Sequence, residues 1–160
     1  MCLRVFLDAK PTDSVTVSIT GDDSTEHQLS ASSLTFTTSN WNTAQTITVT
    51  GVDDSIVDGD ITTTLTATAS NTGGYAGTET ATATLQTSDD DSSGITIAQA
   101  STPLVTTEAG STASFTVVLD AKPTDSVTVS ITGTDDTEHQ LSSSSLTFTP
   151  GNWNTTQTVT

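Results

Sequence analysis

Carboxylates are the side chains of this sequence whose types and spacing suggest chemistry. The chain has 19 acidic and 3 basic residues among 160, which gives a formal net charge of −16. The acidic residues gather in three groups, namely Asp22, Asp23 and Glu26; Asp53, Asp54, Asp58 and Asp60; and Asp89, Asp90 and Asp91. Two carboxylates about 4 Å apart repel each other by roughly 1 kcal/mol in water and by about 4 kcal/mol at a protein-like dielectric. Groups that meet at one end of a fold would therefore be held apart unless a cation lay among them.

Calcium is the ion that such a set of oxygens favours. It accepts about 6–8 oxygen ligands in flexible geometry, whereas zinc and copper prefer His or Cys, which are scarce in this chain. The alternative is that these acids are solvated turn residues, because Asp is common in turns. Residue types and grouping leave both interpretations open.

The other reactive residue types form no recognisable catalytic set. His27 and His139 recur in the same Glu-His-Gln context without a matching nucleophile, so we expect surface or loop-packing roles. Trp41 and Trp153 could form a sugar-binding platform, although packing against a core is the favoured role. The acidic charge opposes nucleic-acid binding, and no apolar run is long enough to span a membrane. We therefore expect a non-enzymatic protein with no nucleic-acid partner and no direct membrane insertion.

The sequence contains an internal repeat, in which Leu7 recurs as Leu119. Residues 7–48 match residues 119–160 at 35 of 42 positions, and we call the separation between Leu7 and Leu119 the repeat offset. One period has the size of a β-sandwich domain, so we expect about one and a half copies taken from a longer array. The predicted domains are residues 1–91, a sandwich that lacks its first strand, and residues 92–160, a second sandwich truncated at its C-terminal end.

Short β-strands are the elements that must position the carboxylates. Hydrophobic residues make up only 32% of the chain, but they alternate with Thr and Ser as half-buried strands require. Turn residues separate these runs at intervals of about ten residues, which is typical of an antiparallel sandwich. The predicted strands are Leu3–Asp8, Ser14–Thr20, Ser33–Thr37, Gln45–Val52, Ile61–Ala69, Glu79–Thr87, Gly94–Ala98, Leu104–Thr107, Ala113–Asp120, Ser126–Thr132, Ser145–Thr149 and Gln157–Thr160.

The segment between the two copies resembles the junction between tandem Calx-beta domains. In residues 83–97 a strand-like run leads into Asp89-Asp90-Asp91, then Gly94, then a second run. Further matches follow in that family's order: Val105 to Gly110, Phe115 to Leu119, Leu34 to Phe36, and Val52-Asp53-Asp54 followed by Asp58. Together these motifs extend over nearly the whole period. The resemblance implies an all-β, immunoglobulin-like antiparallel sandwich.

Carried over by position, the resemblance also implies calcium binding at one end of the sandwich. The implied ligands are Glu26, Asp53, Asp54, Asp58, Asp89, Asp90 and Asp91 for the first copy, and Glu108 and Glu138 for the second. Neither set is complete, since the first copy has no equivalent of Glu108 and the second has none of the residues that follow Thr48 in the first.

The implied function is that of a calcium-stiffened spacer or adhesion segment of a large extracellular or cell-surface protein. Its expected partners are Ca²⁺, neighbouring repeats, and surface glycans or proteins. Two alternatives stay open: a spacer that folds without metal, and a carbohydrate-binding module attached to an extracellular enzyme.

Overall fold

The computed structural model describes residues 1–133, 135 and 137–160, which form twelve β-strands and no helix. None of these residues therefore belongs to a helix that could cross a membrane. The chain divides into two compact units. Unit 1 consists of Met1–Asp54 and Gly59–Asp89, and unit 2 consists of Ser55–Asp58 and Asp90–Thr160. The predicted domains 1–91 and 92–160 remain a prediction.

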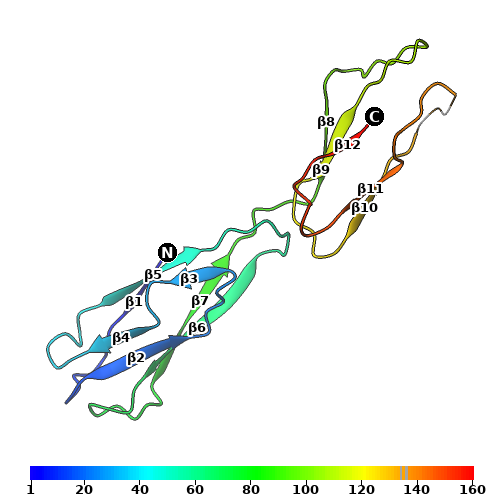
Figure 1. Ribbon diagram of the computed structural model, residues 1–160. Coiled ribbons are helices and arrows are strands. Elements are labelled where there is room, and N and C mark those ends of the chain that lie inside the picture. The colour runs from blue at the N-terminus through cyan, green and yellow to red at the C-terminus, as the bar shows by residue number, and fades with distance from the viewer. Residues whose placement is uncertain (134, 136) are drawn as a thin grey trace. The chain divides into compact units, whose positions relative to one another are not determined.

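Unit 1 is built from seven strands in two antiparallel sheets (Figure 1). The strands are β1 (Cys2–Val5), β2 (Val15–Thr20), β3 (His27–Leu29), β4 (Ser33–Phe36), β5 (Gln45–Gly51), β6 (Ile61–Ala69) and β7 (Thr80–Thr87). One sheet has the order β1-β5-β3 and the other the order β4-β2-β6-β7. In each sheet the outermost strands present one unpaired edge.

Both sheets of unit 1 contribute to a common core, and alternation along the strands decides which residues enter it. In β2, Val15, Val17 and Ile19 are buried and the hydroxylic residues between them are exposed. The buried cluster consists of Leu7, Val15, Val17, Ile19, Phe36, Ile47, Val49, Leu65, Ala69 and Leu85. Alternation of this kind is what allows a chain so rich in Thr and Ser to form a core at all.

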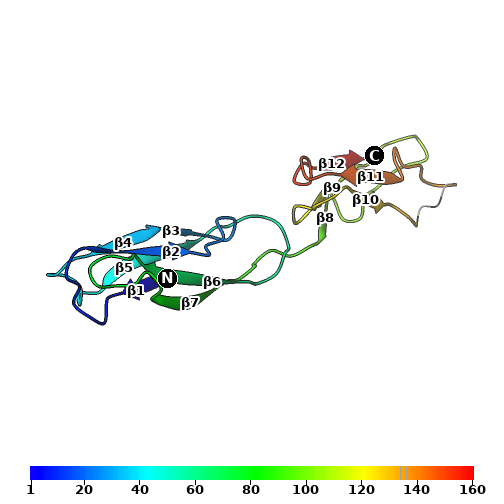
Figure 2. The same cartoon turned by 90° about the horizontal axis from the view of Figure 1, so that it is seen from below.

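Unit 2 has five strands (Figure 2). They are β8 (Ile95–Gln99), β9 (Phe115–Leu119), β10 (Val127–Ser130), β11 (Ser145–Phe148) and β12 (Gln157–Val159). Their orders are β12-β9-β8 and β10-β11, around a smaller core of Val117, Leu119, Leu146, Phe148 and Val159. The described residues of unit 2 include no counterpart of β6 and β7.

Two strand pairings occur in both units and are related by the repeat offset. Val15 lies opposite Phe36 as Val127 lies opposite Phe148, and Val5 opposite Gln45 as Val117 opposite Gln157. Turn hydrogen bonds recur as well. Asn40 Oδ1 accepts the Thr37 N–H at 2.5 Å, and Asn152 Oδ1 accepts the Thr149 N–H at 2.5 Å.

The all-β prediction is confirmed, and most predicted strands are present with ends shifted by a few residues. The predicted strand Leu104–Thr107 is wrong, since only Thr107 pairs, in an isolated bridge to Ser111. Strand β3 was missed, because its three residues His27–Leu29 are too few to show alternation.

Candidate functional site

Four strand ends bring carboxylates to one end of unit 1. β3 and β5 meet there through the pair His27 and Gly51, and β6 and β7 meet through Ile61 and Thr87. The carbonyl oxygen of Glu26 joins the two sheets, because it accepts hydrogen bonds from the Val52 N–H (2.8 Å) and the Thr87 hydroxyl (3.4 Å). We call the carboxylates that flank these strand ends the acidic pole: Glu26, Asp53, Asp54, Asp60 and Asp89.

Hydrogen bonds within the acidic pole hold the end of β7 against the turn before β6. Asp60 Oδ1 accepts the Asp89 N–H at 3.1 Å, and Asp60 Oδ2 accepts the Gln86 side-chain amide at 3.1 Å. Asp89 Oδ2 in turn accepts the Gly59 N–H at 2.7 Å. Two of the carboxylates thus act as acceptors for protein N–H groups, and the sequence-based ligand set had left out Asp60.

The remaining predicted ligands are not part of unit 1. Asp58, Asp90 and Asp91 belong to unit 2. Glu108 is exposed in the turn closed by the Gly110 N–H and the Thr107 carbonyl, and Glu138 is exposed beside a cavity of about 620 Å³. Of the nine predicted ligands, the structure brings Glu26, Asp53, Asp54 and Asp89 to a common end.

Among the described residues, the acidic pole is not a preformed cluster of metal ligands. No group of three or more His, Cys, Asp or Glu side chains of the described residues is placed to hold a metal ion. Calcium requires about 6–8 oxygens, so binding would need side chains of the exposed turns to move inward. Asp53, Asp54 and Asp60 are exposed, whereas Glu26 and Asp89 are half-buried.

His27, the residue after Glu26, is buried. Its side chain is 2% exposed, and neither ring nitrogen has a hydrogen-bond partner among the described residues. Nearby, the Thr25 hydroxyl (2.6 Å) and backbone N–H (3.1 Å) both donate to Asp23 Oδ1 and hold the pKa of Asp23 below its usual value, with a smaller contribution from the charge of His27. Of the two roles expected for His27, surface and loop packing, burial excludes the surface role, while His139 at the equivalent position is exposed.

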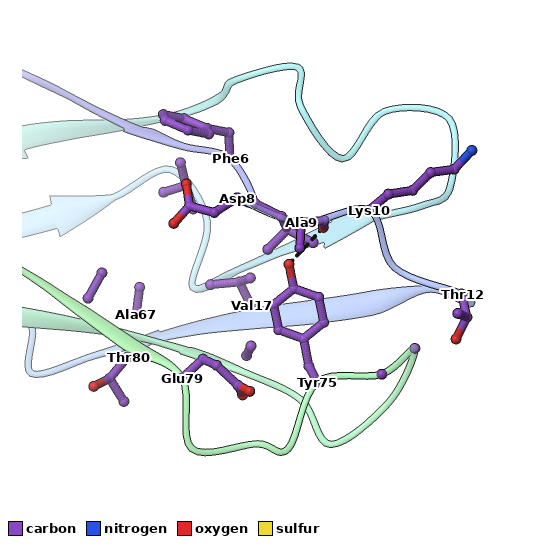
Figure 3. Close-up of a pocket in the computed structure, with 16 residues that line it drawn as sticks. Phe6, Asp8, Ala9, Lys10, Thr12, Val17, Ala67, Tyr75, Glu79 and Thr80 are labelled. Carbon is purple, nitrogen blue, oxygen red and sulfur yellow. Dashed lines mark hydrogen bonds between the residues drawn. The ribbon is translucent and has the colours of Figure 1, made fainter.

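A groove lies beside the end of β1 and the segment that follows it, and Figure 3 shows its residues. The Tyr75 hydroxyl donates to the Ala9 carbonyl at 2.8 Å across it. The Glu79 carboxylate accepts the backbone N–H groups of Ala76, Gly77 and Thr78, and these bonds hold its pKa below the usual value. The lining of the groove mixes apolar side chains with the charged residues Asp8, Lys10 and Glu79.

Both tryptophans are half-buried. Trp41 packs against the core of unit 1 and Trp153 against the core of unit 2, which confirms the favoured packing role. Their backbone carbonyls also accept equivalent bonds, from the Leu7 N–H (2.9 Å) and the Leu119 N–H (3.2 Å).

Comparison with known proteins adds no family to this description. No protein-family model, curated protein or solved structure matches the chain.

Proposed function

We propose that the chain is part of a non-enzymatic array of immunoglobulin-like sandwich repeats of Calx-beta type, which acts as a spacer or adhesion segment of an extracellular or cell-surface protein. The observation that carries this proposal is the recurrence of the same pairings and turn bonds at the repeat offset. Repetition of one β unit along a chain produces length rather than a single reactive centre.

Calcium is the second part of the proposal. The acidic pole concentrates five carboxylates at one end of unit 1, in a chain whose net charge is −16. Calcium accepts irregular oxygen sets, and the exposed turn that carries Asp53 and Asp54 could move toward it. A bound ion would then restrict those turns and stiffen the repeat.

A spacer that folds without metal is the second candidate, and a specific observation favours it. Asp60 and Asp89 already bond to the Asp89 and Gly59 N–H groups, so the end of the unit is closed by protein contacts alone. Hydrogen bonds to charged groups contribute about 1.5–3 kcal/mol each when well shielded, and less at exposed sites.

Calorimetric titration of the chain with CaCl₂ at about 0.15 M salt separates these two candidates. The double variant Asp53→Asn/Asp54→Asn should weaken calcium binding by at least about tenfold. The control Asp13→Asn/Asp125→Asn removes the same charge from two turns outside the acidic pole and should bind calcium like the unaltered chain. Absence of saturable binding, or equal weakening by both variants, would leave only the metal-free spacer.

A further inference from the structure

The turn between β11 and β12 contains the tripeptide Asn154-Thr155-Thr156. Asn followed two residues later by Thr, with no Pro between them, is the context in which asparagine accepts an N-linked glycan. The other asparagines, which lack Ser or Thr two residues later, are Asn40, Asn42, Asn71 and Asn152. In a chain so rich in Thr such a tripeptide arises easily, so its surroundings in the fold decide whether it can act as a site.

The residues just before Asn154 anchor the turn to unit 2. Asn152 Oδ1 accepts hydrogen bonds from the Thr149 N–H at 2.5 Å and the Thr149 hydroxyl at 2.9 Å. Trp153 packs against the core, and its carbonyl accepts the Leu119 N–H at 3.2 Å. The turn is therefore held through Asn152 and Trp153, not through Asn154.

The tripeptide itself faces solvent. Asn154, Thr155 and Thr156 are all exposed. Within the described part of the chain, neither the Asn154 amide nor the Thr156 hydroxyl forms a hydrogen bond. Both groups that define the acceptor context are thus accessible to an enzyme, and their use would break no contact of the fold.

Unit 1 contains the same turn and shows the same exposure. Asn42 takes the place of Asn154 at the repeat offset, and it is exposed. There the turn leads into β5, which pairs with β1 on one side and β3 on the other, so the position stays exposed in the larger unit. Ala44 takes the place of Thr156, and unit 1 therefore lacks the acceptor context.

We propose that Asn154 is an acceptor site for an N-linked oligosaccharide and that unit 1 has no equivalent site. Asn154 Nδ2 forms a bond to the anomeric carbon of the first sugar and loses one proton, while the bond from that carbon to the pyrophosphate of a polyprenyl-linked donor breaks. An oligosaccharyltransferase catalyses the transfer, which involves no oxidation or reduction. The product carries a bulky, hydrophilic group on the surface of unit 2. Its formation in the cell rests on the proposed extracellular location, because such enzymes act on exported chains.

Transfer to the purified, folded chain tests the site directly. The chain is incubated with an oligosaccharyltransferase and a polyprenyl-pyrophosphate oligosaccharide of known mass, and intact mass spectrometry follows the product. We expect the mass of a single glycan to be added. Asn154→Gln and Thr156→Ala should each abolish the addition, whereas the control Thr155→Ala, at the middle residue, should leave it unchanged. Ala44→Thr gives unit 1 the same context and should add a second glycan at Asn42.

A further measurement locates the glycan without any variant. An amidase that releases N-linked glycans converts the modified asparagine to aspartate, so peptide mapping of the unaltered chain identifies the residue. A short Asn-x-Thr peptide in the same reaction shows that the enzyme is active. Modification of this peptide but not of the folded chain, or a glycan that persists in Asn154→Gln, would overturn the proposal. Because all components are purified, either result leaves the proposed extracellular spacer untouched.

Discussion

His27 and His139 occupy equivalent positions of the repeat but differ in their surroundings. His27 is 2% exposed, whereas His139 is exposed with its Nδ1 3.5 Å from the Thr106 hydroxyl. The difference comes from pairing, because His27 begins β3 opposite Gly51, and the described residues of unit 2 form no equivalent strand. An identical tripeptide thus gives a buried imidazole in one unit and a solvated one in the other.

Replacing His27 by Leu should stabilise unit 1 by about 1–2 kcal/mol. The imidazole loses its hydration on burial without gaining a hydrogen bond among the described residues, and an aliphatic side chain of similar size removes that penalty. The matched control His139→Leu, at an exposed position, should change stability by less than about 0.5 kcal/mol. Urea denaturation followed through amide NMR signals of each unit measures both effects. A marked loss of stability in His27→Leu would mean that the imidazole makes a contact whose stabilisation exceeds the cost of burying the ring.

At the scale of the element, the partners of a strand decide what its side chains contribute. β2 and β10 have the same sequence from Val to Ser and pair with β4 and β11 in the same register. Only β2 also pairs with β6. Accordingly Val15 is 0% exposed and Val127 is 36% exposed.

Val15→Ala should therefore lower the free energy of unfolding of unit 1 by about 2 kcal/mol, since it removes buried methyl groups and leaves a cavity. Val127→Ala makes the same chemical change at a partly solvated site and should lower the stability of unit 2 by less than about 1 kcal/mol. Hydrogen exchange of the β2 and β10 amides reports each unit separately. Equal losses at both positions would show that β10 is covered in solution.

Strand alternation allowed most of the fold to be predicted from the sequence, and the failures have physical causes. Val15, Val17 and Ile19 mark one face of β2 unambiguously, because a period of two has no helical interpretation. Leu104–Thr107 combines apolar and hydroxylic residues without this alternation, and only Thr107 pairs with another segment. Pairing is a long-range property that local pattern does not contain.

The candidate site was less predictable than the strands. The sequence predicts that several acidic groups share one end of a sandwich, and the structure brings Glu26, Asp53 and Asp89 to a common end of unit 1, whereas Asp58 and Asp90 belong to unit 2. The distances between their oxygens depend on turn conformations, which Asp and Gly residues leave open. The roles of Asp60 and Asp89 as acceptors for backbone N–H groups follow only from the assembled fold.

For the chain as a whole, the net charge of −16 affects the stability of the folded state. Repulsion among like charges destabilises a compact state, and only three cationic side chains, Arg4, Lys10 and Lys122, offset it. Dissolved ions screen this repulsion over about 8 Å at physiological ionic strength. Any salt should therefore stabilise the chain, and stabilisation by CaCl₂ alone would not identify a calcium site.

Unfolding measured in NaCl, MgCl₂ and CaCl₂ at equal ionic strength separates the general effect from a specific one. Raising NaCl from about 0.01 M to about 0.5 M should increase stability by on the order of 1 kcal/mol, because screening acts on all charges. Calcium bound at the acidic pole should add an increment that grows with the logarithm of its concentration, reaching about 2.7 kcal/mol at 100 times the dissociation constant. Magnesium, which requires a stricter octahedron, should add less. Three superimposable curves would refute calcium binding and leave the spacer proposal intact, whereas a stability that does not respond to NaCl would refute the argument from net charge.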